Sequence, residues 1–232
     1  IEKGETTEAE TTAVSVYPQE KTESDYKTYA KFRDFAKSCY NISIKNAQNM
    51  PTDKGIIICA NHVSKIDYLF VSMAFTKEKF MKLCCMAKKE LFRNDAFSKK
   101  LIKATGMVPV DRGGMNMNTM NSLKAKLKEG WCVVIHPEGT RSADGIFREI
   151  KSGASVLAID AGVPVIPVYI NGAYELFPKG KKIMKFYDTK NKKKFPVDVV
   201  FGEAISSDGK SVEELTTEIQ NAILKLQDEC RK

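Results

Sequence analysis

The chain has 232 residues, of which 43% are hydrophobic and 28% charged, and glycine and proline together make up less than a tenth. This composition excludes collagen-like and wholly disordered proteins and suits one globular domain, because single α/β domains of ~200–250 residues are common. The net charge is +8, and because residues 1–25 are acidic, residues 26–232 carry about +13, which favours nucleic acid, lipid headgroups or a phosphorylated small molecule as partner.

The first 25 residues predict a disordered acidic tail. They are rich in Thr and Glu, poor in hydrophobic residues and without a period. They lack the basic and apolar regions of a secretory signal peptide. Nowhere does the chain approach the ~18 consecutive apolar residues of a membrane-spanning helix. The missing initiator Met leaves room for a membrane anchor upstream of Ile1.

Residues 26–45 predict an amphipathic helical element. Tyr29, Phe32, Ala36 and Cys39 recur at three- and four-residue spacing, with basic side chains between them. Two interpretations stay open for this element. Its apolar side packs on the domain's own core, or, because its polar side is basic, the helix lies on a membrane surface.

Residues 46–232 predict a single domain in which strands and helices alternate. Strands are expected at residues 55–60, 82–87, 107–110, 131–135, 164–170 and 196–201, and helices at 65–75, 96–105, 116–129, 153–161 and 212–229. Near-continuous apolar strands joined by crossover helices predict an α/β fold with a mostly parallel central sheet and helices on both faces. In such sheets, ligands bind beyond the carboxyl ends of the strands.

His62 and Asp67 follow the first of these strands directly. Residues five apart lie about 140° apart on a helix, so the two side chains meet only if His62 ends the strand and Asp67 opens the next helix. The carboxylate would then fix the imidazole tautomer and leave the other ring nitrogen free to accept a proton. A capping carboxylate beside an incidental histidine is the alternative. Ser64 does not indicate a serine hydrolase, because no G-x-S-x-G motif surrounds it.

Arginines near glycines follow two further strands, at Arg112 and Arg141. A guanidinium binds phosphate bidentately, and each charge-assisted bond contributes ~1.5–3 kcal/mol. One such arginine alone would more often be solvated or ion-paired, but two after successive strands, together with Lys88, predict a site for a dianion.

Four sequence blocks, in this order, resemble the signatures of the glycerolipid acyltransferase family, which includes the 1-acylglycerol-3-phosphate (lysophosphatidate) acyltransferases. They are His62-x-x-x-x-Asp67, Gly106-Met107-Val108-Pro109-Val110-Asp111-Arg112-Gly113, Pro137-Glu138-Gly139-Thr140-Arg141-Ser142 and Val163-Pro164-Val165-Ile166-Pro167-Val168. Ala87-Lys88-Lys89-Glu90-Leu91 is similar to another family segment. Together the blocks extend over residues 55–170, about half of the chain.

The resemblance implies a glycerol-3-phosphate acyltransferase-like fold in residues 46–232 and a specific reaction. A fatty acyl group passes from acyl-CoA or acyl-carrier protein to the sn-2 hydroxyl of 1-acylglycerol-3-phosphate and gives phosphatidate. The family motifs place the general base at His62 with Asp67, and ligands of the acceptor's phosphate at Lys88, Arg112 and Arg141. They place Glu138 beside the acceptor, either touching it or holding the loop, with Gly139 and Thr140 shaping the turn.

The implied chemistry needs neither metal nor cofactor beyond the thioester co-substrate, because the thioester is already activated and no covalent enzyme intermediate is required. The six cysteines form no C-x-x-C pair, and four lie in apolar runs, which predicts free thiols in a reducing compartment.

One position departs from the family pattern. The residue before Pro137 is commonly aromatic in the family, and here it is His136. Its planar ring can keep a stacking role, so the departure bears on the acceptor more than on the reaction. The alternatives are another lysophospholipid or glycerol 3-phosphate as acceptor, and a non-catalytic basic lipid-binding module, against which the intact His62 and Asp67 speak.

Residues 179–195 contain eight lysines interleaved with apolar side chains. This pattern is typical of a solvated loop, but the lipid substrates implied above favour docking on an anionic membrane, since each lysine contributes ~1 kcal/mol near such a surface. The expected docking residues are Lys181, Lys182, Lys185, Lys192, Lys193 and Lys194. The protein is then expected to be peripheral, at the cytoplasmic face of a membrane. No recognised nucleic-acid motif accompanies the charge, so no nucleic-acid partner is expected.

Overall fold

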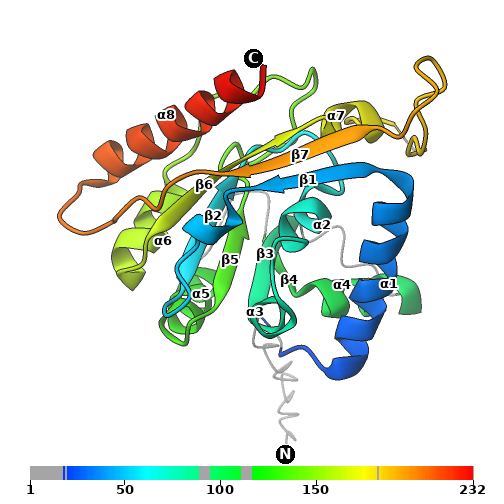
Figure 1. Cartoon of the computed structure of the whole chain (residues 1–232). Coiled ribbons are helices and arrows are strands. Elements are labelled where there is room, and N and C mark those ends of the chain that lie inside the picture. Colours follow the sequence, from blue (N-terminus) through cyan, green and yellow to red (C-terminus); the bar gives the residue numbers. More distant parts are fainter. Residues whose placement is uncertain (1–17, 19, 89–94, 111–116, 182, 232) are drawn as a thin grey trace, which may run out of the picture.

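The computed structural model describes residues 18, 20–88, 95–110, 117–181 and 183–231. A seven-stranded sheet runs through the centre, with helices on both sides (Figure 1). Its strands, in sheet order, are β1 (Asn41–Lys45), β7 (Pro196–Phe201), β6 (Val165–Asn171), β2 (Ile56–Ala60), β5 (Cys132–Ile135), β3 (Leu83–Lys88) and β4 (Met107–Val110).

Five neighbouring strands are parallel, from β6 through β2, β5 and β3 to β4. β7 pairs antiparallel with β6, and β1 pairs parallel with β7, so these two strands run opposite to the rest. The prediction of a mostly parallel sheet in a single α/β domain is therefore confirmed.

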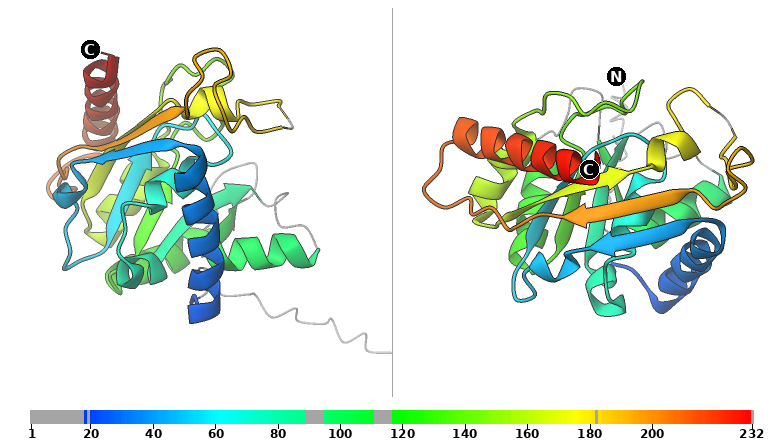
Figure 2. Two further views of the ribbon diagram at one scale, coloured as in Figure 1. Left: turned by 45° about the vertical axis from the view of Figure 1, so that its right-hand side comes forward. Right: turned by 45° about the horizontal axis from the view of Figure 1, so that its top comes forward.

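Helices cover each face of the sheet (Figure 2). One core combines the sheet with α1 (Glu23–Cys39), α2 (Asp67–Ser72), α3 (Lys77–Met81) and α7 (Ala173–Leu176). The other combines it with α5 (Met117–Lys128), α6 (Gly153–Ala161) and α8 (Val212–Arg231). Helix α4 (Ala96–Thr105) packs on α1, and a short 3-10 helix covers Ala47–Asn49.

The central strand β2 explains why its sequence is apolar without alternation. Ile56 and Ile58 contribute to one core, whereas Ile57 and Cys59 contribute to the other. All five β2 residues are at most 1% exposed. A strand covered on both faces needs an apolar side chain at every position.

The predicted helical element at residues 26–45 was wrong in its last part. Helix α1 ends at Cys39, where Tyr40 is extended, and Asn41–Lys45 form the edge strand β1. Ile42 and Ile44 are only half-buried there, because β7 is the single neighbour of β1. Alternating β-branched residues are typical of such a strand.

The predicted acidic tail extended too far along the chain. Asp25 lies inside α1, and with Thr22 it forms a capping box that satisfies free N–H groups at the start of the helix. Lys21 is buried, and its ammonium donates a hydrogen bond to the carbonyl of Leu83. Residues 1–17 and 19, the bulk of the predicted tail, lie outside the described residues.

Among the described residues, none of the helices combines the length and the apolar character needed to cross a bilayer.

Candidate active site

His62 and Asp67 meet at the carboxyl end of β2. His62 follows the strand by two residues, and Asp67 is the first residue of α2. The His62 Nδ1 atom lies 2.8 Å from Asp67 Oδ2. The turn between strand and helix thus brings together two side chains that a continuous helix would separate.

Asp67 is held by the backbone as well as by His62. The same Oδ2 atom also accepts the backbone N–H groups of Val63 and Ser64, each at 2.8 Å, and the side chain is fully buried. Because a carboxylate at Nδ1 keeps the proton on that nitrogen, the lone pair lies on Nε2. The His62 side chain is 24% exposed, so a substrate can reach it.

The loop after β5 is tied to the backbone of His62. Glu138 Oε1 accepts the N–H of His62 at 2.7 Å, and the N–H of Ser142 donates to the His62 carbonyl at 2.7 Å. Glu138 is therefore a residue that holds this loop against the end of β2, and its side chain is largely buried. Gly139 allows the loop to turn, since its φ of +70° suits glycine.

His136 stacks on His62. The ring centroids are 4.1 Å apart and the planes differ by 10°. Nδ1 of His136 donates to the carbonyl oxygens of Ala60 and Asn61, at 3.0 and 3.1 Å. The stacking role expected for this planar ring is thus present, and the partner is the predicted catalytic histidine itself.

His62, Asp67 and His136 also bring possible metal-ligand atoms within 4.8 Å of one another. The geometry does not suit a metal ion. Stacked rings direct their in-plane lone pairs side by side, whereas ligands of one ion must converge on it. The Nδ1 atoms of both rings are already bonded to oxygen acceptors.

The environment keeps both rings neutral. Burial, together with the positive charges of Arg141, Lys88 and Lys179, lowers the pKa of His62 to about 3. Burial likewise lowers the pKa of His136 to about 4. A neutral imidazole is the form that can accept a proton, and the Asp67 carboxylate at Nδ1 would stabilise the imidazolium that then forms.

Burial acts in the opposite direction on the nearby carboxyl groups. It raises the pKa of Asp67 to about 6, although the backbone N–H groups of Ser64 and Val63 favour the charged form. It raises the pKa of Glu138 to about 7. Asp67, which accepts three N–H groups, is therefore ionised at neutral pH.

Three positive side chains, Arg141, Lys88 and Lys179, act on His62 through their charge. One guanidinium nitrogen of Arg141, Nη1, is buried and has no partner among the described residues. A buried donor without a partner is costly unless a ligand completes it. Lys88 ends β3, and Arg112 lies outside the described residues.

Lys179 is a site residue that the sequence analysis missed. It was assigned to the basic segment, yet its ammonium donates to Thr140 Oγ1 at 3.4 Å and its charge acts on His62. Its distance along the chain from the family blocks hid this contact. The predicted docking residues Lys181, Lys185, Lys192, Lys193 and Lys194 are exposed on the same segment, and Lys182 lies outside the described residues.

A His–Asp pair at the carboxyl end of the central strand β2, with Arg141 Nη1 unbonded among the described residues, is an arrangement that can activate a hydroxyl next to an anionic group. Residues 41–171 match the family model described as Acyltransferase. The chain therefore belongs to the acyltransferase family.

Two proteins named as acyltransferases are similar in sequence to this chain. The 1-acyl-sn-glycerol-3-phosphate acyltransferase of Bacillus subtilis is 31% identical over 143 residues, which cover 60% of this chain and 69% of that protein. The probable 1-acyl-sn-glycerol-3-phosphate acyltransferase of Mycoplasma pneumoniae is 29% identical over 168 residues, 71% of this chain and 62% of its own length.

The fold is also shared with a solved structure. The crystal structure of the 1-acyl-sn-glycerophosphate acyltransferase PlsC from Thermotoga maritima superposes with a TM-score of 0.68 at 25% identity, over 89% of this chain and 81% of that one.

Proposed function

We propose that this enzyme transfers a fatty acyl group from a thioester to the sn-2 hydroxyl of 1-acylglycerol-3-phosphate and forms phosphatidate. The observation that carries the proposal is the His62–Asp67 pair beside the unpartnered Nη1 of Arg141. One group suits a hydroxyl and the other a phosphate, and both occur in this acceptor. The names of the relatives support the same acceptor.

The general base is His62. Its Nε2 removes the proton of the sn-2 hydroxyl while that oxygen attacks the thioester carbonyl. The tetrahedral intermediate then collapses, the C–S bond breaks, and the imidazolium returns its proton to the departing thiolate. Asp67 holds the Nδ1 proton and stabilises the imidazolium, and such base catalysis contributes ~10²–10⁴-fold.

Arg141 is the main phosphate ligand among the described residues, and Lys88 and Lys179 add positive charge. The family resemblance assigns Arg112 to the same cradle. A bound dianion would offset the charges that lower the pKa of His62, so the acceptor strengthens the base that deprotonates it.

The donor is acyl-CoA or acyl-carrier protein, and the reaction uses no metal or further cofactor. The enzyme works as a peripheral protein at the cytoplasmic face of a membrane, because its acceptor and product are membrane lipids.

A panel of acceptors tests the proposal. Thiol release from acyl-CoA is measured with 1-acylglycerol-3-phosphate, 1-acylglycerol, glycerol 3-phosphate and lysophosphatidylcholine, and the lipid products are identified by mass. We expect fast turnover with the first acceptor alone. An equal rate with 1-acylglycerol would contradict the role of Arg141 as a phosphate ligand. Fast turnover of glycerol 3-phosphate would mean that this compound, and not 1-acylglycerol-3-phosphate, is the acceptor.

His62→Ala separates catalysis from simple lipid binding. We expect thiol release to fall by ~10²-fold or more, since the general base is lost. Unchanged thiol release by the variant would mean that His62 is not the base, and no release above background by the unmodified protein would point instead to a non-catalytic lipid-binding protein.

A further inference from the structure

Helix α1 carries apolar side chains on two sides, one buried and one exposed. Tyr29 and Ala36 pack into the core, whereas Phe32 and Phe35 remain 37% and 53% exposed. The core therefore accounts for only one of the two apolar sides, and the other side faces outward.

The second exposed apolar segment is the lysine-rich loop, residues 177–195, between α7 and β7. Ile183, Phe186 and Tyr187 are 83%, 43% and 50% exposed. Five of the seven large hydrophobic side chains that are exposed among the described residues thus lie on α1 and this loop. Exposed apolar side chains that gather on one surface indicate an interaction site.

Aromatic contacts join the two segments. The Phe35 and Phe186 rings meet edge to face with centroids 5.8 Å apart, and Tyr40 stacks near Phe186 at 6.4 Å. The Tyr40 hydroxyl donates to the Lys185 carbonyl at 2.9 Å. Segments about 145 residues apart in sequence therefore form one surface, at the end of α1 where the loop projects (Figures 1 and 2).

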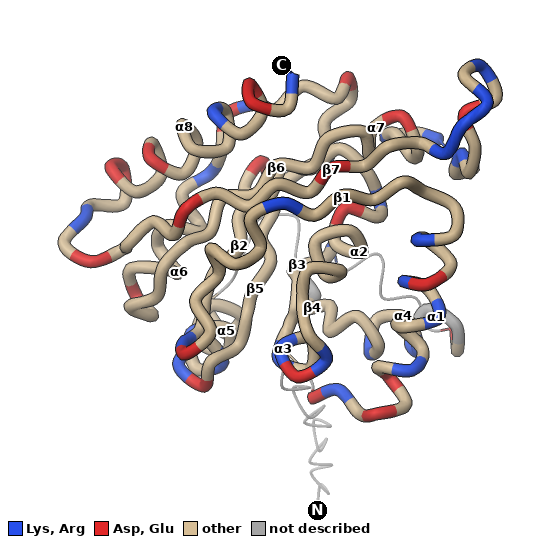
Figure 3. The backbone as a smooth tube through the Cα atoms, viewed as in Figure 1, with Lys and Arg blue, Asp and Glu red and all other residues tan. Residues whose placement is uncertain are grey.

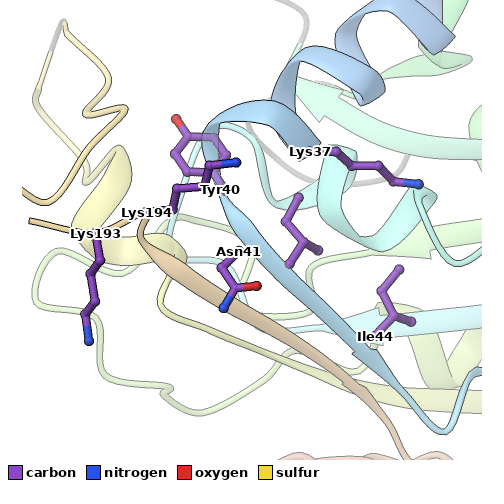
Figure 4. A pocket seen from close by; sticks show the side chains of 7 residues that line it. Lys37, Tyr40, Asn41, Ile44, Lys193 and Lys194 are labelled. Carbon is purple, nitrogen blue, oxygen red and sulfur yellow. The ribbon is translucent and has the colours of Figure 1, made fainter.

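Positive charge surrounds this apolar surface. Figure 3 shows basic residues concentrated along the lysine-rich loop. Next to it, an open groove is lined by Lys37, Tyr40, Asn41, Ile42, Ile44, Lys193 and Lys194 (Figure 4). Asp188, an acidic residue of the loop, accepts a hydrogen bond at Oδ2 from the Asn191 side-chain amide at 2.7 Å. None of the three groove lysines forms an ion pair with another described residue.

The loop also touches the catalytic site. Ser64 Oγ donates to the Phe177 carbonyl at 3.3 Å, and the Lys65 ammonium lies 4.8 Å from the centre of the Phe177 ring. Two residues on, Lys179 reaches Thr140 of the catalytic loop. The surface and the site are therefore continuous.

We infer that α1 and the lysine-rich loop form one docking surface for a bilayer that contains anionic phospholipids. Phe32, Phe35 and Ile183 enter the interfacial layer, and the groove lysines contact headgroup phosphates. An exposed apolar centre with a lysine rim matches a bilayer, where apolar and anionic layers lie against each other. The choice of a bilayer rests on the proposed function, whose acceptor and product are membrane lipids.

Vesicle co-sedimentation tests this surface without any measurement of catalysis. The full chain is mixed with vesicles of phosphatidylcholine alone or with 30 mol% phosphatidylglycerol. We expect binding to the anionic vesicles and much weaker binding to the neutral ones. Lys193→Glu/Lys194→Glu should weaken anionic binding at least ~10-fold, since each lysine contributes ~1 kcal/mol at such a surface. Ile183→Asp should weaken binding to both kinds of vesicle.

The matched control is Lys54→Glu/Lys128→Glu. It makes the same charge change at exposed positions at the opposite end of the sheet, before β2 and at the end of α5. We expect its binding to stay within about twofold of the unmodified protein, and thermal unfolding confirms that every variant folds.

Three results would overturn the inference: no binding of the unmodified protein to anionic vesicles, equal binding of the surface variants, or an equal loss in the control. Loss of binding to an acidic acyl-carrier protein in the lysine variant, with vesicle binding intact, would assign the surface to a protein partner. Since no step needs turnover, failure of the proposed reaction gives a different pattern: intact vesicle binding with no phosphatidate formed.

Discussion

Three donors converge on a single oxygen of Asp67: the Nδ1–H of His62 and two backbone N–H groups. This arrangement gives the carboxylate two roles, because it orients the imidazole and also closes the turn between β2 and α2. A purely structural cap would need only the backbone bonds. The two roles can be separated by a change that keeps the shape of the side chain.

Asp67→Asn retains an oxygen for the backbone N–H groups but removes the charge that stabilises the imidazolium. We expect kcat to fall by ~10²–10⁴-fold because the tautomer and the imidazolium lose support. Thermal unfolding should change little in comparison with Asp67→Ala. If thiol release by the Asn variant stays within threefold of the original rate, Asp67 is a cap and not a partner of the base.

His136→Phe keeps a planar ring against His62 and removes one titrating group. The pKa of folded His136 is about 4, below the ordinary 6.5, so between these values the unfolded chain binds a proton that the folded chain does not. His136 therefore lowers stability as the pH falls below 6.5, by up to ~1.4 kcal/mol per pH unit, and has no such effect above it.

Thermal unfolding of both proteins at pH 7.5 and 5.0 checks this sign. We expect the unmodified protein to lose more stability on acidification than His136→Phe does. An equal loss would mean that His136 is already protonated in the folded protein at pH 5.0.

At the scale of elements, a side chain holds the end of β2 in place: Asn61, the residue after the strand, bonds to the backbone of the neighbouring strand β6. The Asn61 side chain donates to the Ile170 carbonyl at 3.0 Å and accepts the Ile170 N–H at 2.7 Å. Asn61 is completely buried. It thereby fixes β2 against β6 one residue before the catalytic histidine.

Asn61→Ala leaves both backbone groups of Ile170 buried and unpaired, which costs ~1–3 kcal/mol for each group. We expect a lower Tm and a lower kcat, because His62 loses its anchor. Asn49→Ala is the control, since it removes a hydrogen bond to Glu203 in an exposed place. A normal kcat in a destabilised Asn61→Ala protein would show that β5 and the Glu138 contact suffice to place His62.

The whole molecule assembles the charges of the site from distant parts of the chain. Lys88 comes from the end of β3, Arg141 from the loop after β5 and Lys179 from the lysine-rich loop. Burial lowers the pKa of His62, and these three charges lower it further. A phosphate bound among them should therefore raise that pKa again.

Proton NMR can follow this effect, because the chain has only two histidines and His136→Phe leaves the signal of His62 alone. Glycerol 3-phosphate should move the pKa of His62 upward by about one pH unit, and Arg141→Ala should raise it without ligand and weaken the response to ligand. If neither glycerol 3-phosphate nor Arg141→Ala changes the pKa of His62, the phosphate site lies elsewhere.

Much of this architecture could be read from local patterns. The apolar runs predicted six of the seven strands, and helical periodicity predicted α4, α5, α6 and α8 close to their observed bounds, and α1 except for its end. Edge strand β1 was missed because the predicted helical element was extended over its five residues, of which only Ile42 and Ile44 are apolar. The short helices α3 and α7 escaped because four or five residues carry too little periodicity to detect.

Residue types and their spacing along the chain were enough to indicate the sheet, the His62–Asp67 pair and a basic, phosphate-directed site, because each depends on neighbours within a few residues of a strand end. The stack of His136 on His62, the contact of Lys179 with Thr140, and the union of α1 with the lysine-rich loop were decided by tertiary packing. Each joins segments tens of residues apart or more, and such contacts form only when the crossovers of the sheet bring those segments to one edge.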